Sequence, residues 1–149
     1  MSLQSEIMTQ LKAAMKAKDQ VALTSLRAVK AELLLLQTAT GTKEEVSVAE
    51  EIKLLQKMVK QRKDSAVIFE TQNRADLVAP ELEQAEVIAR FLPAQLTEAA
   101  VAEIVIEAIA QLNASGMKDM GKVMGYVNKA VAGQADGKTI SVLVKKHLQ

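Results

Sequence analysis

The stretch that decides the fold is residues 47–73, SVAEEIKLLQKMVKQRKDSAVIFETQN. Its apolar residues recur at steps of three, four and seven, which is the period of a helix buried along one face. These residues are Val48, Ile52, Leu55, Val59, Ala66 and Phe69. Ser47 followed by Glu50 is the pattern of a capping box, which marks a helix start. The stretch therefore predicts one long helix that ends at about Asn73.

The flanking residues repeat this pattern. One apolar stripe covers residues 3–17, and a second begins after Asp19, a suitable N-cap, and ends by Gly41, which suits the position just after a helix. On the C-terminal side, Pro80 is tolerated in the first turn of a helix but not in its interior. We therefore expect a fourth helix from about Pro80 to Phe91.

The segment LPAQLT around Pro93 is the best candidate for a domain boundary. Pro93 blocks the preceding helix, and Thr97 is a suitable N-cap for a new one. Three shorter amphipathic patterns follow, separated by glycine-containing turns. We expect an all-α chain with a helical N-terminal domain of about four helices, residues 1–93, and a small three-helix C-terminal domain, residues 97–149.

The composition excludes most catalytic chemistry. The chain has no cysteine, so disulfides, thiolate nucleophiles and cysteine metal sites are ruled out. Its single histidine, His147, lies two residues from the C-terminus, where a rigid supporting shell is not expected. We expect no catalytic residue, no metal and no cofactor. Because the first residues carry neither a basic segment nor a long apolar run, we interpret the chain as cytoplasmic and without membrane contact.

Two segments imitate a phosphate-binding P-loop, which needs two glycines with four residues between them, then Lys and Ser or Thr, between a strand and a helix. Residues 133–139, GQADGKT, have one residue too few between the glycines and contain a carboxylate. Residues 116–122, GMKDMGK, have the correct spacing, but Val123 stands where the hydroxyl belongs. We interpret both as helix caps.

Charge is distributed unevenly along the chain. Residues 1–113 contain 13 basic and 16 acidic side chains, whereas residues 114–149 contain six lysines and two aspartates, a net charge of +4. Such a split can mark a surface that binds polyanions, although a solvated face is the favoured interpretation.

Two glycines one turn apart, Gly121 and Gly125, need an explanation because each costs about 1 kcal/mol relative to alanine inside a helix. The favoured explanation is tight helix–helix packing inside the small domain. The alternative is close approach of an RNA sugar–phosphate backbone, with Lys118 and Lys122 supplying charge.

The long helix of residues 47–73 also has a basic side, with lysines at 53, 57 and 60 followed by Arg62 and Lys63. Glu50 can pair with Lys53 one turn away, so an ordinary solvated face is favoured over a nucleic-acid contact. The chain has only three aromatic residues, so sequence-specific recognition of single strands is not expected.

Five segments together resemble the YqeY-like family over essentially the whole chain. They are LR (residues 26–27), KQRKDS (60–65), FLPAQL (91–96), MKDMGKVMG (117–125) and GQADGK (133–138). The resemblance implies a helical N-terminal domain and a small helical domain similar to the tail of the B subunit of tRNA-dependent Asp/Glu amidotransferase. Pro80 departs from the family pattern, which usually continues a charged helix there.

In that amidotransferase the tail domain helps to hold tRNA. The resemblance therefore associates the chain with carbon–nitrogen ligase activity that uses glutamine as amido-N-donor, but only through RNA handling and without turnover of its own. By this correspondence the candidate RNA-binding residues are Lys118, Gly121, Lys122, Gly125 and Lys138.

Two functions of different classes remain open. The first is a non-catalytic, tRNA-associated binding module. The second is a protein-interaction adaptor, alone or as an accessory to an amidotransferase complex, which docks on an amidotransferase, a synthetase or a ribosomal protein. Methionines at 117, 120 and 124 support the adaptor, because flexible methionine side chains suit adaptable protein contacts.

Overall fold

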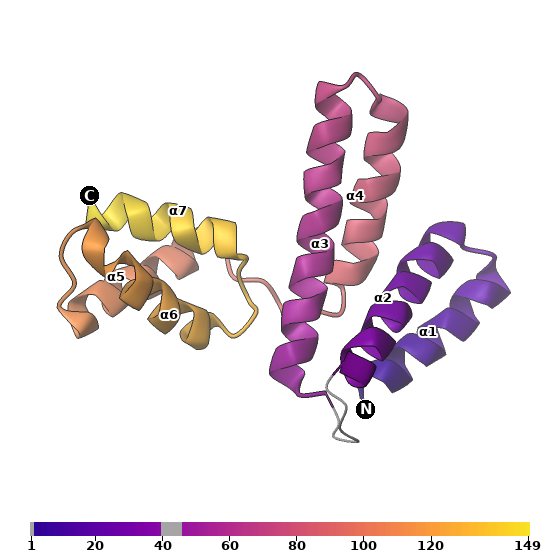
Figure 1. Ribbon diagram of the computed structural model, residues 1–149, viewed down its shortest axis with the longest axis horizontal. Helices are drawn as coiled ribbons and strands as arrows, with labels where there is room; N and C mark the ends of the chain where they lie inside the picture. The colour runs from indigo at the N-terminus through magenta and orange to yellow at the C-terminus, as the bar shows by residue number, and fades with distance from the viewer. Residues whose placement is uncertain (1, 40–45) are drawn as a thin grey trace. The chain divides into compact units, whose positions relative to one another are not determined.

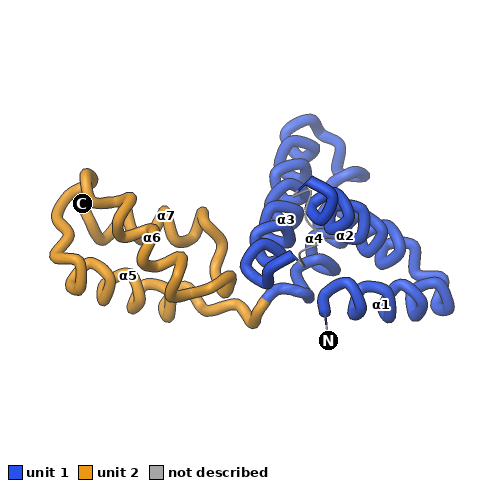
Figure 2. The backbone as a smooth tube through the Cα atoms, turned by 60° about the horizontal axis from the view of Figure 1, so that its bottom comes forward, with its two compact units in different colours: residues 1–92 blue, residues 93–149 orange. Residues whose placement is uncertain are grey.

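The computed structural model describes residues 2–39 and 46–149, and all regular secondary structure within these ranges is helical (Figure 1). The all-α prediction is confirmed. The chain divides into two compact units, residues 1–92 and 93–149, which Figure 2 shows in different colours. Over the described part of the chain, no helix is both long enough and apolar enough to cross a membrane.

The N-terminal unit consists of two antiparallel helical hairpins, α1 (Leu3–Ala17) with α2 (Gln20–Ala39), and α3 (Val48–Thr71) with α4 (Ala75–Ala89). Helix α2 packs against both α1 and α4, so it joins the hairpins. One apolar core lies between them. Its fully buried large side chains are Ile7, Leu26, Val29, Leu55 and Ile88.

Local capping chemistry fixes two of these helix starts as the sequence predicts. The Ser47 hydroxyl accepts a hydrogen bond from the Glu50 amide at 3.2 Å, and the Glu50 carboxylate accepts one from the Ser47 amide at 2.9 Å. The Asp19 carboxylate accepts a hydrogen bond from the amide of Ala22 at 3.0 Å. The predicted helix end at Gly41 lies outside the described residues.

The predicted start of α4 at Pro80 is wrong, because α4 begins at Ala75 and continues through the proline. Asn73 adopts a left-handed conformation with φ 58°, which reverses the chain directly after α3. Arg74 and Asp76 then pair at 3.0 Å across the first turn of α4. Proline has no amide hydrogen, so the carbonyl of Asp76, four residues earlier, has no helical hydrogen-bond partner. Asp76 and Pro80 are both exposed, so this carbonyl lies on an exposed stretch of the helix.

Arg62 connects the two helices of the second hairpin. Its Nε donates to the Gln84 side chain on α4 at 3.2 Å, and its Nη1 donates to the carbonyl of Met58 at 3.3 Å. The side chain is half-buried. Arg62 therefore belongs to the packing between α3 and α4, in contrast to the exposed lysines of α3.

The C-terminal unit contains α5 (Glu98–Leu112), a 3-10 turn η1 (Met117–Asp119), α6 (Met120–Val131) and α7 (Gly137–Leu148). The three α-helices all contact one another around a single apolar core. That core is built mainly from small β-branched residues, and its fully buried members are Val101, Val105, Ala108, Val123, Val127, Val131, Ile140 and Val144.

Two glutamines tie the start of this unit to the turn between α6 and α7. The Gln95 amide donates to the carbonyl of Gly133 at 3.0 Å, and the Gln134 amide donates to the carbonyl of Ala94 at 3.2 Å. The Leu96 amide donates to the carbonyl of Gln134 at 2.8 Å. The FLPAQL and GQADGK segments thus contact each other, and this contact gives both a structural role.

Candidate nucleic-acid interface

Helix α6 has one fully buried side, and the glycines lie on the opposite side. Val123, Val127 and Val131 recur every four residues and are completely inaccessible to solvent. At 3.6 residues per turn, Gly125 lies about 160–200° around the helix axis from its two neighbouring valines. Both Gly121 and Gly125 are exposed.

The packing explanation for these glycines is wrong. A Cβ atom added to either Gly121 or Gly125 would meet no atom within 4 Å outside the helix's own backbone and its chain neighbours. Neither residue has a positive φ, so the backbone does not require glycine either. Within the described residues, therefore, nothing offsets the cost of about 1 kcal/mol that Gly125 imposes inside α6. Gly121 is the second residue of the helix, so the cost of an interior glycine applies to Gly125 above all.

Lysines flank the glycines on the same side of α6. Lys122, Gly125 and Lys129 fall within about 60° of one another around the helix axis. Lys118 lies just before α6 in η1, and all the lysines of this group are exposed. We call Lys118, Gly121, Lys122, Gly125 and Lys129 the glycine–lysine face.

Sequence reasoning missed Lys129 as a member of this face. The signal was present in the sequence, because valines at 123, 127 and 131 define the buried side and place residues 122, 125 and 129 opposite it. The spacing of the glycines alone does not reveal this.

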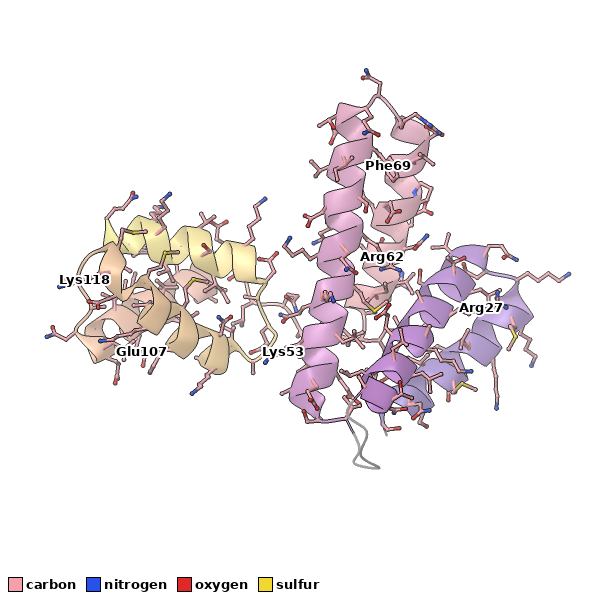
Figure 3. The ribbon with its side chains drawn as sticks, in the orientation of Figure 1. Arg27, Lys53, Arg62, Phe69, Glu107 and Lys118 are labelled. Atoms are coloured by element: carbon pink, nitrogen blue, oxygen red, sulfur yellow. The ribbon has the colours of Figure 1, made fainter. Side chains whose placement is uncertain are left out.

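Lys138 does not belong to the glycine–lysine face. It is exposed in the first turn of α7, directly after the turn that follows α6. Because α7 follows α6 after a short turn, Lys138 comes soon after the C-terminal end of α6. Lys118, which Figure 3 labels, lies just before the N-terminal end of α6. Lys138 can thus add its positive charge only at the C-terminal end of a binding surface that runs along α6.

The turn before α6 is held by its own side chains. The Asp119 carboxylate accepts a hydrogen bond from the amide of Ser115 at 2.9 Å, and Gly116 takes a φ of 73° that favours glycine. At the other P-loop imitation, the Asp136 carboxylate accepts from the amide of Thr139 at 2.7 Å and caps α7. The interpretation as a helix cap is confirmed for residues 133–139. For residues 116–122 it is wrong, because Asp119 bonds to the preceding amide of Ser115 and no side chain caps the start of α6.

The charges of the C-terminal unit are segregated by helix. Helix α5 carries Glu98, Glu103 and Glu107 and no basic residue. All six lysines of the unit lie on η1, α6 and α7, where the acidic residues are Asp119 and Asp136. Figure 3 labels one residue of each sign, Lys118 and Glu107. The unit therefore has an acidic helix and a basic helix pair, and the glycine–lysine face lies on the basic pair.

The methionine stripe of this unit is mostly part of the core packing. Met120 and Met124 are half-buried and packed against the apolar core, whereas Met117 is exposed. Tyr126 is also half-buried against the core. Little of this stripe is therefore available to an external partner.

Features typical of catalytic or metal sites are few in the described part of the chain. No group of three or more His, Asp or Glu side chains placed to hold a metal occurs there. His147 is half-buried in the last turn of α7.

A shallow groove of about 50 Å³ lies between α1 and α2, lined by residues that include Ile7, Lys30 and Leu34. This volume is far below the roughly 300–1,000 Å³ of typical small-molecule pockets.

Comparison with known proteins gives a family match over nearly the whole chain and matches to relatives over 61–84% of it. A family model described as "Yqey-like protein" matches residues 4–148. "Altered inheritance of mitochondria protein 41, mitochondrial" from Pyrenophora tritici-repentis (strain Pt-1C-BFP) is 31% identical over 129 residues, which cover 84% of this chain and 68% of that protein. The protein of the same name from Clavispora lusitaniae (strain ATCC 42720) is 34% identical over 91 residues, which cover 61% of this chain and 52% of that protein.

Both relatives are described by name as mitochondrial, and neither name states a ligand or a reaction. The cytoplasmic interpretation of this chain therefore stays a prediction.

Proposed function

The chain belongs to the YqeY-like family, and on that premise we propose that it is a non-catalytic module that binds tRNA through the sugar–phosphate backbone. The glycine–lysine face of α6 is the contact surface. The expected association with a glutamine-dependent amidotransferase remains a separate prediction.

The single observation that carries the proposal is the exposure of Gly121 and Gly125 in the middle of a lysine-rich helix face. Glycine is costly in a helix and useful where another backbone must come close. Inside the unit no such neighbour exists, since the space over both residues is open. A partner from outside must therefore be the one that approaches, and the flanking lysines suit a partner with regularly spaced negative charges.

The composition of the face determines how RNA is recognised. Lysine ammonium groups bind phosphates as point charges, and the face contains neither arginine nor an exposed aromatic ring. Base stacking and bidentate base contacts are therefore unavailable. Recognition of backbone shape, as in the regular phosphate rows of folded RNA, is the mode that these residues support.

The adaptor function has weaker support than RNA binding. It depends on an exposed methionine surface, and two of the three methionines pack on the core. The large apolar side chains that are exposed in the C-terminal unit are Ile106, Leu112, Met117 and Val142, which come from α5, η1 and α7. Single exposed apolar side chains are normal on a protein surface and do not by themselves indicate a protein-docking patch.

Equilibrium titration of labelled, unmodified tRNA with the full-length chain tests the proposed function. With about three or four lysine–phosphate contacts, and using the B-DNA coefficient of about 0.9 per phosphate, log affinity is expected to fall against log salt with a slope of roughly −3 to −4. Fluorescence anisotropy between 50 and 300 mM salt measures this slope. Absence of binding at 50 mM salt, or binding that does not respond to salt, would contradict the proposal.

A further inference from the structure

The strongest concentration of positive charge in the chain lies on α3, in the N-terminal unit. Residues 52–63, IKLLQKMVKQRK, contain five basic side chains and no acidic one. Arg62 is used in packing against α4, as described above, which leaves the four lysines at 53, 57, 60 and 63 exposed. Sequence reasoning favours a solvated face here, and the structure gives grounds to revise that interpretation.

Three of these lysines form a strip directly opposite the buried side of α3. Lys53, Lys57 and Lys60 fall within about 60° of one another around the helix axis. Leu55 and Met58 face the core from the other side. Figure 3 shows Lys53 projecting from α3 on the side away from α2 and α4. The strip therefore faces away from the rest of the N-terminal unit.

The charge of this strip is poorly compensated. The sequence suggests that Glu50 pairs with Lys53, but the Glu50 carboxylate instead accepts hydrogen bonds from the Ser47 amide and hydroxyl, both at 2.9 Å. Those bonds lower the pKa of Glu50, and Lys53 adds only the smallest contribution. Lys60 pairs with Asp64 at 2.6 Å. Within residues 2–39 and 46–149, neither Lys53 nor Lys57 has an ion pair.

We propose that Lys53, Lys57 and Lys60 on α3 form a second phosphate-binding strip, with which the N-terminal unit contacts the backbone of the same RNA. Like charges one turn apart destabilise a helix, so the unpaired lysines Lys53 and Lys57 are costly side by side unless a polyanion binds them. The strip repeats the arrangement on α6, since Lys53 and Lys60 are seven residues apart, as are Lys122 and Lys129.

The choice of RNA as the occupant rests on the proposed function and on charge complementarity. Two rows of lysines, one on each unit of the same chain, gain affinity when a single long polyanion spans both, because the second contact forms at a high effective concentration. RNA is a long polyanion with regularly spaced phosphates, whereas an acidic protein surface of mixed composition does not have regularly spaced charges.

The test compares two double variants of the full-length chain that lose the same charge. Lys53→Gln with Lys57→Gln removes the unpaired part of the strip. Lys12→Gln with Lys16→Gln is the matched control, because these lysines are also exposed and one turn apart, on α1. We expect the α3 variant to weaken tRNA binding about tenfold at 100 mM salt and to reduce the salt slope by about 1–2, while the control stays within twofold of wild type.

Each outcome of this test has a distinct meaning. If wild type binds tRNA and the α3 variant binds like the control, the second strip is refuted while the proposed function stands. If wild type does not bind at 50 mM salt, both are refuted. Polyglutamate at equal charge concentration is the competing probe. If it binds as tightly as tRNA and loses affinity in the α3 variant to the same extent, the strip recognises acidic protein and the RNA assignment is overturned.

Discussion

Replacing Lys118 and Lys122 by glutamate is expected to weaken tRNA binding roughly a hundredfold at 0.15 M salt. Each lost lysine–phosphate contact removes about 0.9 from the salt slope, and each reversed charge adds repulsion from the same phosphate row. The slope should therefore decrease in magnitude by about 2. Anisotropy titrations at several salt concentrations measure both quantities on one variant.

The control for this variant is Lys12→Glu with Lys16→Glu, which makes the same change in net charge on α1. A nonspecific loss of attraction would weaken both variants equally. Folding is not expected to suffer in the α6 variant, because Lys118 and Lys122 are exposed and make no ion pair with any described residue. Equal affinity of the two variants would refute the assignment of the contact to α6.

Replacing Gly125 by leucine is expected to leave the protein at least as stable as wild type and to abolish most tRNA binding. Leucine and alanine are better helix formers than glycine by about 0.8–1 kcal/mol, and the space over Gly125 is open. The melting midpoint of the C-terminal unit should rise by roughly 4–8 °C. A leucine side chain there keeps a phosphate backbone away from the helix, so affinity should fall by more than tenfold.

Alanine at the same position separates packing from contact. Gly125→Ala should give the same rise in melting midpoint with a smaller loss of affinity, because a methyl group extends less far than leucine. Calorimetry and tRNA titration on the same three proteins measure both effects. A lowered midpoint in both variants would mean that Gly125 has a packing role after all. Unchanged affinity of the leucine variant would mean that nothing approaches the helix there.

The helix starts were the most predictable part of the fold, because their determinants are local. Ser47 and Glu50 close a capping box within four residues of sequence, and Thr97 and Asp136 each cap the helix that follows them. The start of α4 was not predictable in this way. It depends on the left-handed conformation of Asn73 and on how α4 packs against α3, which together outweigh the preference of Pro80 for a first turn.

The candidate site was predictable in its residues but not in its geometry. Gly121, Gly125, Lys118 and Lys122 follow from the sequence, yet the glycine pair is equally compatible with a packed and an open environment. Only the position of a neighbouring helix decides between these, and the structure shows that the neighbours of α6 contact its valine side. The local bonds of Glu50 were likewise not given by spacing alone: its carboxylate bonds to the Ser47 amide and hydroxyl, and Lys53 makes only the smallest contribution to lowering its pKa.

The central claim is that RNA contacts the glycine–lysine face of α6, and amide NMR of the full-length chain tests it most directly. Unlabelled tRNA is added to ¹⁵N-labelled protein at 50 mM salt, and the amide signals are followed residue by residue. The account predicts that the signals of Gly121, Lys122, Gly125 and Lys129 shift or broaden first, while those of the acidic helix α5 around Glu103 and Glu107 change little. Shifts that leave α6 unchanged, or no shifts at all, would contradict it.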